Sequence, residues 1–244
     1  MRRSRDFSAR PGPNVAIPRI TVLASGRGSN FAALVDAERN GILGGTIASL
    51  VTNRPDARAL AIAAAHGIPA SVIDHRAFAE RDDFDVALAD AIERSETDLV
   101  VLAGFMRILG PAFIGRFAGR MLNVHPSLLP MYPGLDTHRR ALADGVRIHG
   151  CSVHFVTNDV DHGPIVMQGA VAVQHRDDEA TLAARVLAVE HRLLAAAVRA
   201  FCEDRLVIAG RKVRVKDEST PDTPFEVPSP LARKGATSIR PPSP

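Results

Sequence analysis

Short apolar runs with β character alternate with amphipathic helical stretches along the first half of the chain, and this alternation constrains the fold most. The runs that indicate buried strands are residues 20–24, 47–51, 70–73, 99–103 and 121–124. Between them, apolar residues recur at helical spacing over residues 30–39, 57–65, 84–93 and 111–118. Strands joined by helices of this length connect through right-handed crossovers and pair in parallel. The pattern predicts an α/β fold with a doubly wound, mainly parallel sheet and a Rossmann-like N-terminal half.

The second half of the chain has a different pattern, and both ends differ again from the domain between them. Two consecutive strands, a long helix and a short hairpin are expected at residues 151–156, 165–173, 178–201, and 205–208 with 212–215. Seven prolines and scattered charges follow Lys216, a composition that cannot bury a core. We therefore expect one domain over residues 19–216, a disordered leader over 1–18 and a disordered tail over 217–244.

The overall charge and composition exclude several classes of protein. The pI of about 9.3 comes from residues 1–10, which hold four arginines and one aspartate; the rest of the chain has 26 basic and 26 acidic residues. A neutral domain does not indicate a nucleic-acid partner. No apolar run approaches the roughly 20 residues that cross a bilayer. Cys151 and Cys202 show neither ligand spacing nor a disulfide framework. A cytoplasmic protein without membrane or nucleic-acid partners is expected, as a monomer or homodimer.

Two polar side chains interrupt the apolar run at residues 121–125. Asn123 and His125 are two residues apart, so they project from the same face of a strand. Prolines at 126, 130 and 133 then end the strand and exclude a helix. In open α/β sheets, pockets form at the carboxyl ends of the strands. An amide that can stabilise an oxyanion beside an imidazole that can move a proton is the minimum equipment for acyl transfer.

A glycine-rich turn follows the first predicted strand. Gly26 and Gly28 precede Ser29, Asn30 and an expected helix, so free N–H groups at the helix start could hold a phosphate. The same residues could equally form an ordinary tight turn with Ser29 or Asn30 as N-cap. The turn has neither the G-x-G-x-x-G pattern nor the lysine of a P-loop. The residues alone leave both interpretations open.

Four motifs together resemble a known family. The segments at residues 102–109, 122–130, 149–156 and 161–164 are similar to those of phosphoribosylglycinamide formyltransferases, and the resemblance extends over residues 19–214. It implies the formyltransferase fold. It also implies transfer of a formyl group from 10-formyltetrahydrofolate, a co-substrate, to the amine of glycinamide ribonucleotide in purine biosynthesis. Both partners are small molecules.

The resemblance also assigns the candidate site residues. Asn123, His125 and Asp161 are implied as catalytic, with Asp161 beside the imidazole. Contacts to the ribonucleotide are implied for Gly28, Ser29, Asn30 and Glu190, and contacts to folate for Arg81, Met106, Arg107, Ile108 and Leu109. Without the resemblance, Glu190 and Arg81 would be read as exposed charges, and Ile108 and Leu109 as packing residues. Because a nearby carboxylate favours the imidazolium, the pKa of His125 is expected to be raised.

Three alternatives and the question of a metal complete the expectations. The histidines lack H-x-x-x-H and H-E-x-x-H spacing, so no metal is expected. Formyltetrahydrofolate deformylase has a similar catalytic domain, normally after a regulatory domain, whereas about 18 residues precede the first strand here. Methionyl-tRNA formyltransferase needs a basic C-terminal domain. A non-catalytic nucleotide-binding module would use the glycine turn but has no need of Asn123, His125 and Asp161 together.

Overall fold

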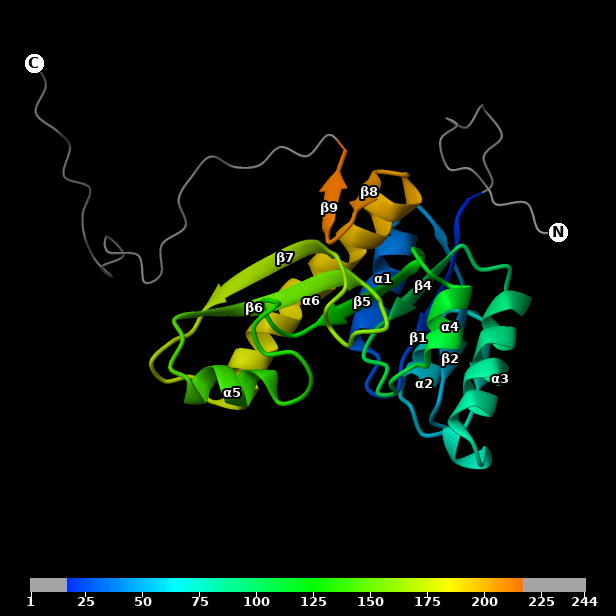
Figure 1. Ribbon diagram of the computed structural model, residues 1–244, viewed down its shortest axis with the longest axis horizontal. Helices are drawn as coiled ribbons and strands as arrows, with labels where there is room; N and C mark the ends of the chain where they lie inside the picture. Colours follow the sequence, from blue (N-terminus) through cyan, green and yellow to red (C-terminus); the bar gives the residue numbers. More distant parts are fainter. Residues whose placement is uncertain (1–16, 217–244) are drawn as a thin grey trace, which may run out of the picture.

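The computed structural model describes residues 17–216, and Figure 1 shows how their elements follow one another. The strands are β1 (Arg19–Leu23), β2 (Thr46–Thr52), β3 (Ala70–Val72), β4 (Leu99–Leu102), β5 (Met121–His125), β6 (Ile148–Phe155), β7 (Ile165–Ala172), β8 (Leu206–Ala209) and β9 (Lys212–Val215). The helices are α1 (Ser29–Arg39), α2 (Ala59–Ala65), the short 3-10 helix η1 (His75–Ala77), α3 (Arg81–Arg94), α4 (Pro111–Arg116), α5 (Thr137–Ala143) and α6 (Glu179–Cys202).

All the strands belong to one sheet, in the order β3-β2-β1-β4-β5-β6-β7-β9-β8. Five of its eight pairings are parallel, including every pairing from β3 to β5. This half has the strand order of a Rossmann-like unit. Strands β6 and β7 then continue the sheet in antiparallel pairing. The prediction of a mainly parallel α/β sheet with a Rossmann-like first half is confirmed.

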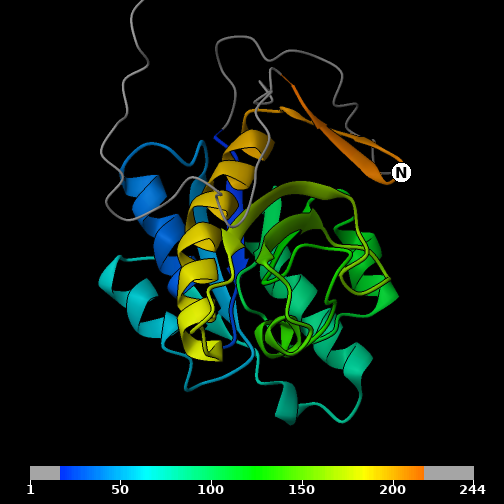
Figure 2. The ribbon, with the colours of Figure 1, turned by 90° about the vertical axis from the view of Figure 1, so that its left-hand side faces the viewer.

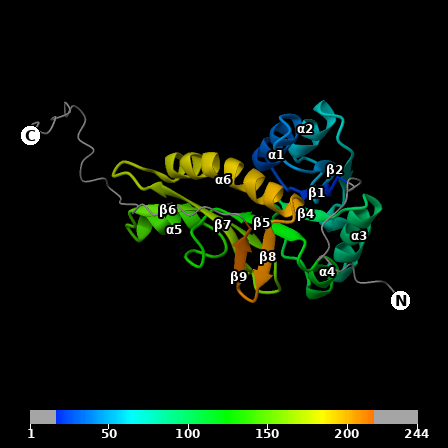
Figure 3. The same ribbon diagram turned by 90° about the horizontal axis from the view of Figure 1, so that it is seen from above.

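Helices cover both faces of the sheet, as Figures 2 and 3 show. One apolar cluster joins α1, α2 and α6 to alternate residues of the central strands, and a second joins α3 and α4 to the residues between them. Thus Val22 faces α1 and Leu23 faces α3, because successive side chains of a strand point to opposite faces. This two-layer burial fixes the strand register, and with it the edge at which the strands end.

The structure extends the predicted elements at several boundaries and adds the helix α5 and the short 3-10 helix η1. Helix α5 is absent from the sequence prediction, because its seven residues follow a proline-rich loop and offer less than two apolar turns. It packs beside α6 through Leu142. The Pro18 carbonyl accepts the N–H of Thr46, so backbone pairing begins one residue before β1. The leader up to residue 16 and the tail from residue 217 lie outside the described residues.

Within the described part of the chain, none of the helices combines the length and apolar character that a bilayer crossing requires. The longest, α6, begins with a capping box in which Asp178 and Thr181 exchange hydrogen bonds. Charged residues alternate with its apolar stripe, as in a helix that packs on a sheet and faces solvent on its other side.

Candidate active site

The end of β5 positions two of the three predicted catalytic residues. His125 is the last residue of the strand and is 6 % exposed. Its Nε2–H donates to the carbonyl oxygen of Tyr132, 2.9 Å away, in the loop that the prolines create. In the neutral ring the other nitrogen, Nδ1, therefore presents a lone pair, and it is the atom at which a proton can be taken up.

Asp161 lies against that nitrogen. Its Oδ2 is 3.4 Å from Nδ1 of His125 and accepts the N–H of Gly134 at 2.8 Å. The residue has a positive φ of 57°, a left-handed conformation that aspartate and asparagine tolerate better than most residues. The loop before β7 thus turns the carboxylate back toward the end of β5, and the structure brings His125 and Asp161 together as expected.

The third residue, Asn123, is held by a histidine from the neighbouring strand. Asn123 pairs with His154 across β5 and β6. The Nδ1–H of His154 donates to the Phe155 carbonyl at 2.9 Å, and its Nε2, 3.1 Å away, accepts an amide N–H of Asn123. The same Nε2 lies 3.7 Å from Oδ1 of Asp161. One amide N–H of Asn123 remains available to a substrate oxygen.

In the sequence, His154 alternates with Val153 and Phe155 and could belong either to the core or to a pocket; the structure places it inside the candidate site. It is 2 % exposed and contacts both Asn123 and Asp161. The signal that could have found it is its position on an antiparallel strand directly opposite Asn123. That signal requires the strand pairing, which the sequence alone does not supply.

The glycine turn after β1 ends in an uncapped helix. Gly28 is the N-cap residue of α1, with φ of 75°, and no side chain bonds the free N–H groups of the first turn. A Cβ atom on Gly28 would lie 2.9 Å from the backbone of Ala59, so the close packing of α2 also requires glycine there. Ser29 is the first helical residue and is partly exposed. Free N–H groups at a helix start suit an anion.

Glu190 joins this turn from the far end of the chain. Its Oε2 accepts the amide N–H of Asn30 at 2.8 Å, and both side chains are buried. Burial raises the pKa of Glu190, although the hydrogen bond from Asn30 opposes the shift. The Oδ1 atom of Asn30 is buried without a partner. The alternative reading of Glu190 as an exposed helix charge is therefore wrong, because α6 turns this residue toward α1.

The loop after β4 holds the residues expected to contact folate. Met106 and Ile108 are 68 % and 64 % exposed, whereas Leu109 is buried in the core between α3 and the sheet. Arg81 donates to the carbonyl of Ile108 from the start of α3. Arg107 lies over the ring of Phe84, 5.9 Å from its centroid. The packing interpretation is thus right for Leu109 and wrong for Ile108.

No group of three or more potential metal-ligating side chains occurs among residues 17–216. A cavity of about 100 Å³ lies between α3 and α4, where Asp85, Phe113 and Arg116 are among its lining residues. None of the predicted catalytic residues lines that cavity, so the convergence of side chains at the strand ends defines the candidate site instead.

Comparisons with known proteins decide the family. The family model described as formyl transferase matches residues 18–198. Phosphoribosylglycinamide formyltransferase of Escherichia coli is 46 % identical over 187 residues, which cover 77 % of this chain and 88 % of that protein. The crystal structure of glycinamide ribonucleotide transformylase 1 from Symbiobacterium toebii superposes with a TM-score of 0.81 and 46 % identity, over 82 % of this chain and 95 % of the other. The chain belongs to the phosphoribosylglycinamide formyltransferase family.

Membership makes the protein an enzyme, a formyltransferase of purine biosynthesis, and gives it the fold of that family. A formyltetrahydrofolate deformylase from Pseudomonas syringae is a more distant relative. It is 28 % identical, with a TM-score of 0.77 over 83 % of this chain and 67 % of the deformylase. The deformylase alternative and the non-catalytic alternative therefore both give way to the formyltransferase.

Burial and the neighbouring polar groups together set the pKa values of the candidate catalytic pair, His125 and Asp161. Burial lowers the pKa of His125 and outweighs the Tyr132 carbonyl and Asp161, which raise it. The expectation of a raised pKa is wrong, because it counted the carboxylate but not the loss of solvent. Burial raises the pKa of Asp161, but the nearby His154, the hydrogen bond from the Gly134 N–H and the nearby imidazole of His125 outweigh it, so that pKa lies below its ordinary value. The resting pair is a neutral imidazole beside a carboxylate.

A second histidine pair behind the site should make the stability of the enzyme depend on pH. Burial, followed by the neighbouring His138, lowers the pKa of His149 to about 4. His149 lies 3.2 Å from His138 and edge-on to the ring of Tyr132. The unfolded chain binds a proton near pH 6.5, before the folded one does, so stability is full above that pH and falls as pH drops toward 4.

We expect the free energy of unfolding, measured with urea, to fall between pH 7 and 4.5, and the titration of His149 to account for at most about 3 kcal/mol of that fall. In His149→Gln, which does not titrate, the loss over the same interval should be smaller by that amount, although the variant is less stable at pH 7. Equal losses in both proteins would show that His149 is not the neutral buried group described here.

Proposed function

We propose that Asn123, His125 and Asp161 catalyse transfer of the formyl group of 10-formyltetrahydrofolate to the amine of glycinamide ribonucleotide. The observation that supports this most is the 3.4 Å contact between Nδ1 of His125 and Asp161, with the Asn123 amide beside them. His125 ends β5, Asn123 lies two residues earlier on the same strand, and Asp161 comes from the loop between β6 and β7. A structural histidine would need one partner there, whereas this arrangement provides a proton acceptor, a carboxylate and an amide donor.

The proposed reaction is a direct transfer without a covalent enzyme intermediate. The amine nitrogen attacks the formyl carbon, a new C–N bond forms, and the carbonyl oxygen becomes an oxyanion. The neutral imidazole of His125 takes up the proton that the amine loses, and the resulting imidazolium and one N–H of Asn123 stabilise that oxygen. His125, with Asp161 and water, then passes this proton to the folate nitrogen as its bond to the formyl carbon breaks. The products are the formylated ribonucleotide and tetrahydrofolate, and no metal takes part.

The two substrates would occupy the two sides of this centre. On one side, the N–H groups near Gly28, Ser29 and Asn30 would bind the phosphate of the ribonucleotide, with Glu190 contacting the remainder of that molecule. This assignment is supported by the uncapped start of α1 and by the bond between Asn30 and Glu190.

On the other side, folate would bind along the loop after β4. The exposed side chains of Met106 and Ile108 offer an apolar wall, and backbone groups of Arg107 and Leu109 offer hydrogen bonds. Arg81 supports the loop through the Ile108 carbonyl. We further propose that the enzyme acts in the cytoplasm, as a monomer or homodimer.

Asp161→Asn tests the assignment of Asp161. Because the carboxylate raises the pKa of His125, its loss should move the midpoint of the pH–rate profile that belongs to His125 to lower pH, not only reduce the rate. Asparagine tolerates the left-handed backbone of residue 161, so the loop should keep its course.

The matched control is Asp159→Asn, which removes an exposed carboxylate two residues away in the same loop. It should leave the profile unchanged. A profile of unaltered shape in Asp161→Asn would remove Asp161 as the partner of His125.

A further inference from the structure

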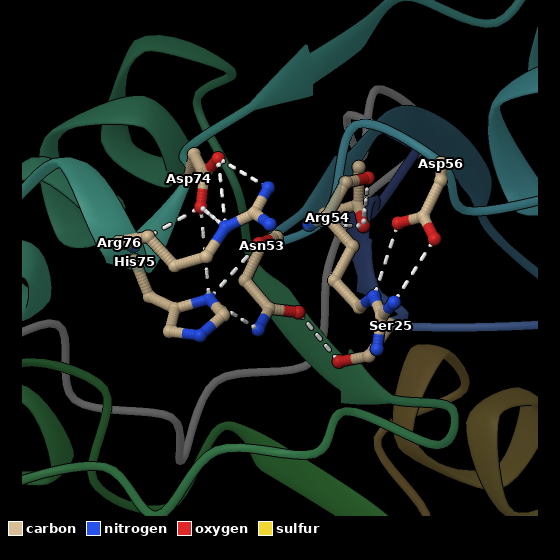
Figure 4. A network of polar contacts seen from close by, with 8 residues as sticks. Ser25, Asn53, Arg54, Asp56, Asp74, His75 and Arg76 are labelled. Carbon is tan, nitrogen blue, oxygen red and sulfur yellow. Dashed lines mark hydrogen bonds and ion pairs between the residues drawn. The ribbon is translucent and has the colours of Figure 1, made fainter.

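A row of polar contacts joins the carboxyl ends of β1, β2 and β3, and Figure 4 shows its members. Each strand contributes one residue just beyond its end: Ser25 after β1, Asn53 after β2, and His75 in η1 after β3. Ser25 and Asn53 are 4 % and 2 % exposed. None of the three is among the residues assigned to catalysis or to substrate contact.

The row begins at the loop after β4. The N–H of Ser25 donates to the Gly104 carbonyl at 3.1 Å, and its Oγ accepts the N–H of Met106 at 2.7 Å. The single hydroxyl proton of Ser25 then goes to Oδ1 of Asn53, 2.6 Å away. Ser25 therefore fixes the loop backbone at two points, and its hydroxyl orientation depends on Asn53.

Asn53 is oriented in turn by His75. The Nδ1 atom of His75 lies 3.1 Å from the side-chain amide nitrogen of Asn53 and 3.1 Å from the backbone carbonyl oxygen of the same residue. In either tautomer, then, the ring is tied to Asn53. The amide consequently points its oxygen at Ser25 and its nitrogen at His75.

The row returns to the same loop through an aromatic ring. The ring of His75 meets the ring of Phe84 edge-on, at 6.4 Å between centroids, and Phe84 lies under the guanidinium of Arg107 at 5.9 Å. Two consecutive loop residues are thus held by the two ends of the row. Ser25 contacts Met106, and His75 contacts Arg107 through the ring of Phe84.

This support matters because the middle of the loop, between the buried Phe105 and Leu109, has little packing of its own. Met106 and Ile108 are mostly exposed, so their side chains cannot hold the backbone in place. Backbone hydrogen bonds have to do so, and the N–H of Met106 has its partner in Ser25. A loop fixed in this way presents its apolar side chains and free backbone groups in one arrangement before a ligand arrives.

We propose that Ser25, Asn53 and His75 are positioning residues for the folate co-substrate, acting through the backbone of Met106 and Arg107. The inference rests on the proposed function, since it takes the loop after β4 to be the folate site. The three residues touch neither the reacting atoms nor the ribonucleotide contacts, so their loss should weaken folate binding selectively.

The test compares Michaelis constants for the two substrates in Asn53→Ala. The Michaelis constant for 10-formyltetrahydrofolate should rise about tenfold, the effect of one or two lost hydrogen bonds, while that for glycinamide ribonucleotide changes less than twofold. His75→Ala should produce the same selective change and is a second test at a less buried position. Turnover at saturating folate should stay within about threefold of the parent enzyme.

The matched control is Thr21→Val, which removes a hydroxyl buried in a separate network with Ser49 and Thr97. It should lower the melting temperature without changing either Michaelis constant. If both His75→Ala and Asn53→Ala leave the folate constant unchanged, or change both constants equally, the positioning role is refuted.

Ile108→Glu separates this result from a failure of the proposed folate site. The variant places a charge on the exposed apolar wall and should raise the folate constant whether or not the positioning row acts. An unchanged folate constant in Ile108→Glu would overturn the folate site itself. A raised constant in Ile108→Glu with no effect of Asn53→Ala and His75→Ala would overturn the positioning role alone.

Discussion

His125→Ala is expected to lower turnover by at least about 10²-fold, because general acid–base catalysis contributes about 10²- to 10⁴-fold. The side chain is the group at this centre that can both take up and return a proton, at the nitrogen 3.4 Å from Asp161. Single-turnover measurements with both substrates saturating would report the chemical step directly.

Folding and binding should survive this change. The imidazole makes one hydrogen bond, to the Tyr132 carbonyl, and folate binding depends on a different loop. Folate affinity, measured by calorimetry, should therefore stay within a few-fold of the parent enzyme. A folded variant with near-parental turnover would remove His125 from the mechanism.

Ser29→Glu is expected to raise the Michaelis constant of the ribonucleotide about 10- to 100-fold, because charge-assisted hydrogen bonds contribute about 1.5–3 kcal/mol each. The substitution places a negative charge at the first residue of α1, where the phosphate should lie. The folate constant should change little. Thr46→Glu, which adds the same charge at the exposed start of β2, is the matched control and should affect neither constant.

The same enzyme preparations distinguish an amine acceptor from water. Without glycinamide ribonucleotide, formate should be released slowly from 10-formyltetrahydrofolate, and tetrahydrofolate should form rapidly once the ribonucleotide is added. Rapid formate release that needs no ribonucleotide and is unaffected by Ser29→Glu would instead identify a hydrolase.

The fold was predictable because its pattern is local. Each strand of the parallel half is a short apolar run, and each crossover helix shows its own apolar periodicity, so their order determines the layers. The placement of Asn123 and His125 on one face of a strand was predictable for the same reason, because two residues that are two positions apart in a strand project from the same face. Helix α5 was not, because its seven residues contain too little periodicity.

The pKa values and burial of the charged site residues were harder to predict from the sequence, because they depend on the burial and neighbours of each side chain in the folded protein. The direction of the His125 pKa shift follows from the burial of the ring beneath the loop that contains Tyr132. Glu190 lies four residues from Val186 and from Leu194, on the buried face of α6, but a glutamate there reads from sequence as an exposed charge. The position of His154 in the site could not be predicted from the sequence, because it depends on the pairing of β6 with β5.

The bond between Asn30 and Glu190 spans 160 residues, from the first helix of the domain to the last. During synthesis on the ribosome, the strands β1 to β5 and the glycine turn emerge long before Glu190 does. A nascent chain therefore carries three of the four proposed ribonucleotide contacts and lacks Glu190 until α6 leaves the exit tunnel and packs on α1. On the proposed assignment, the complete ribonucleotide site arises only with the last helix, so a shorter product of interrupted translation would lack its Glu190 contact.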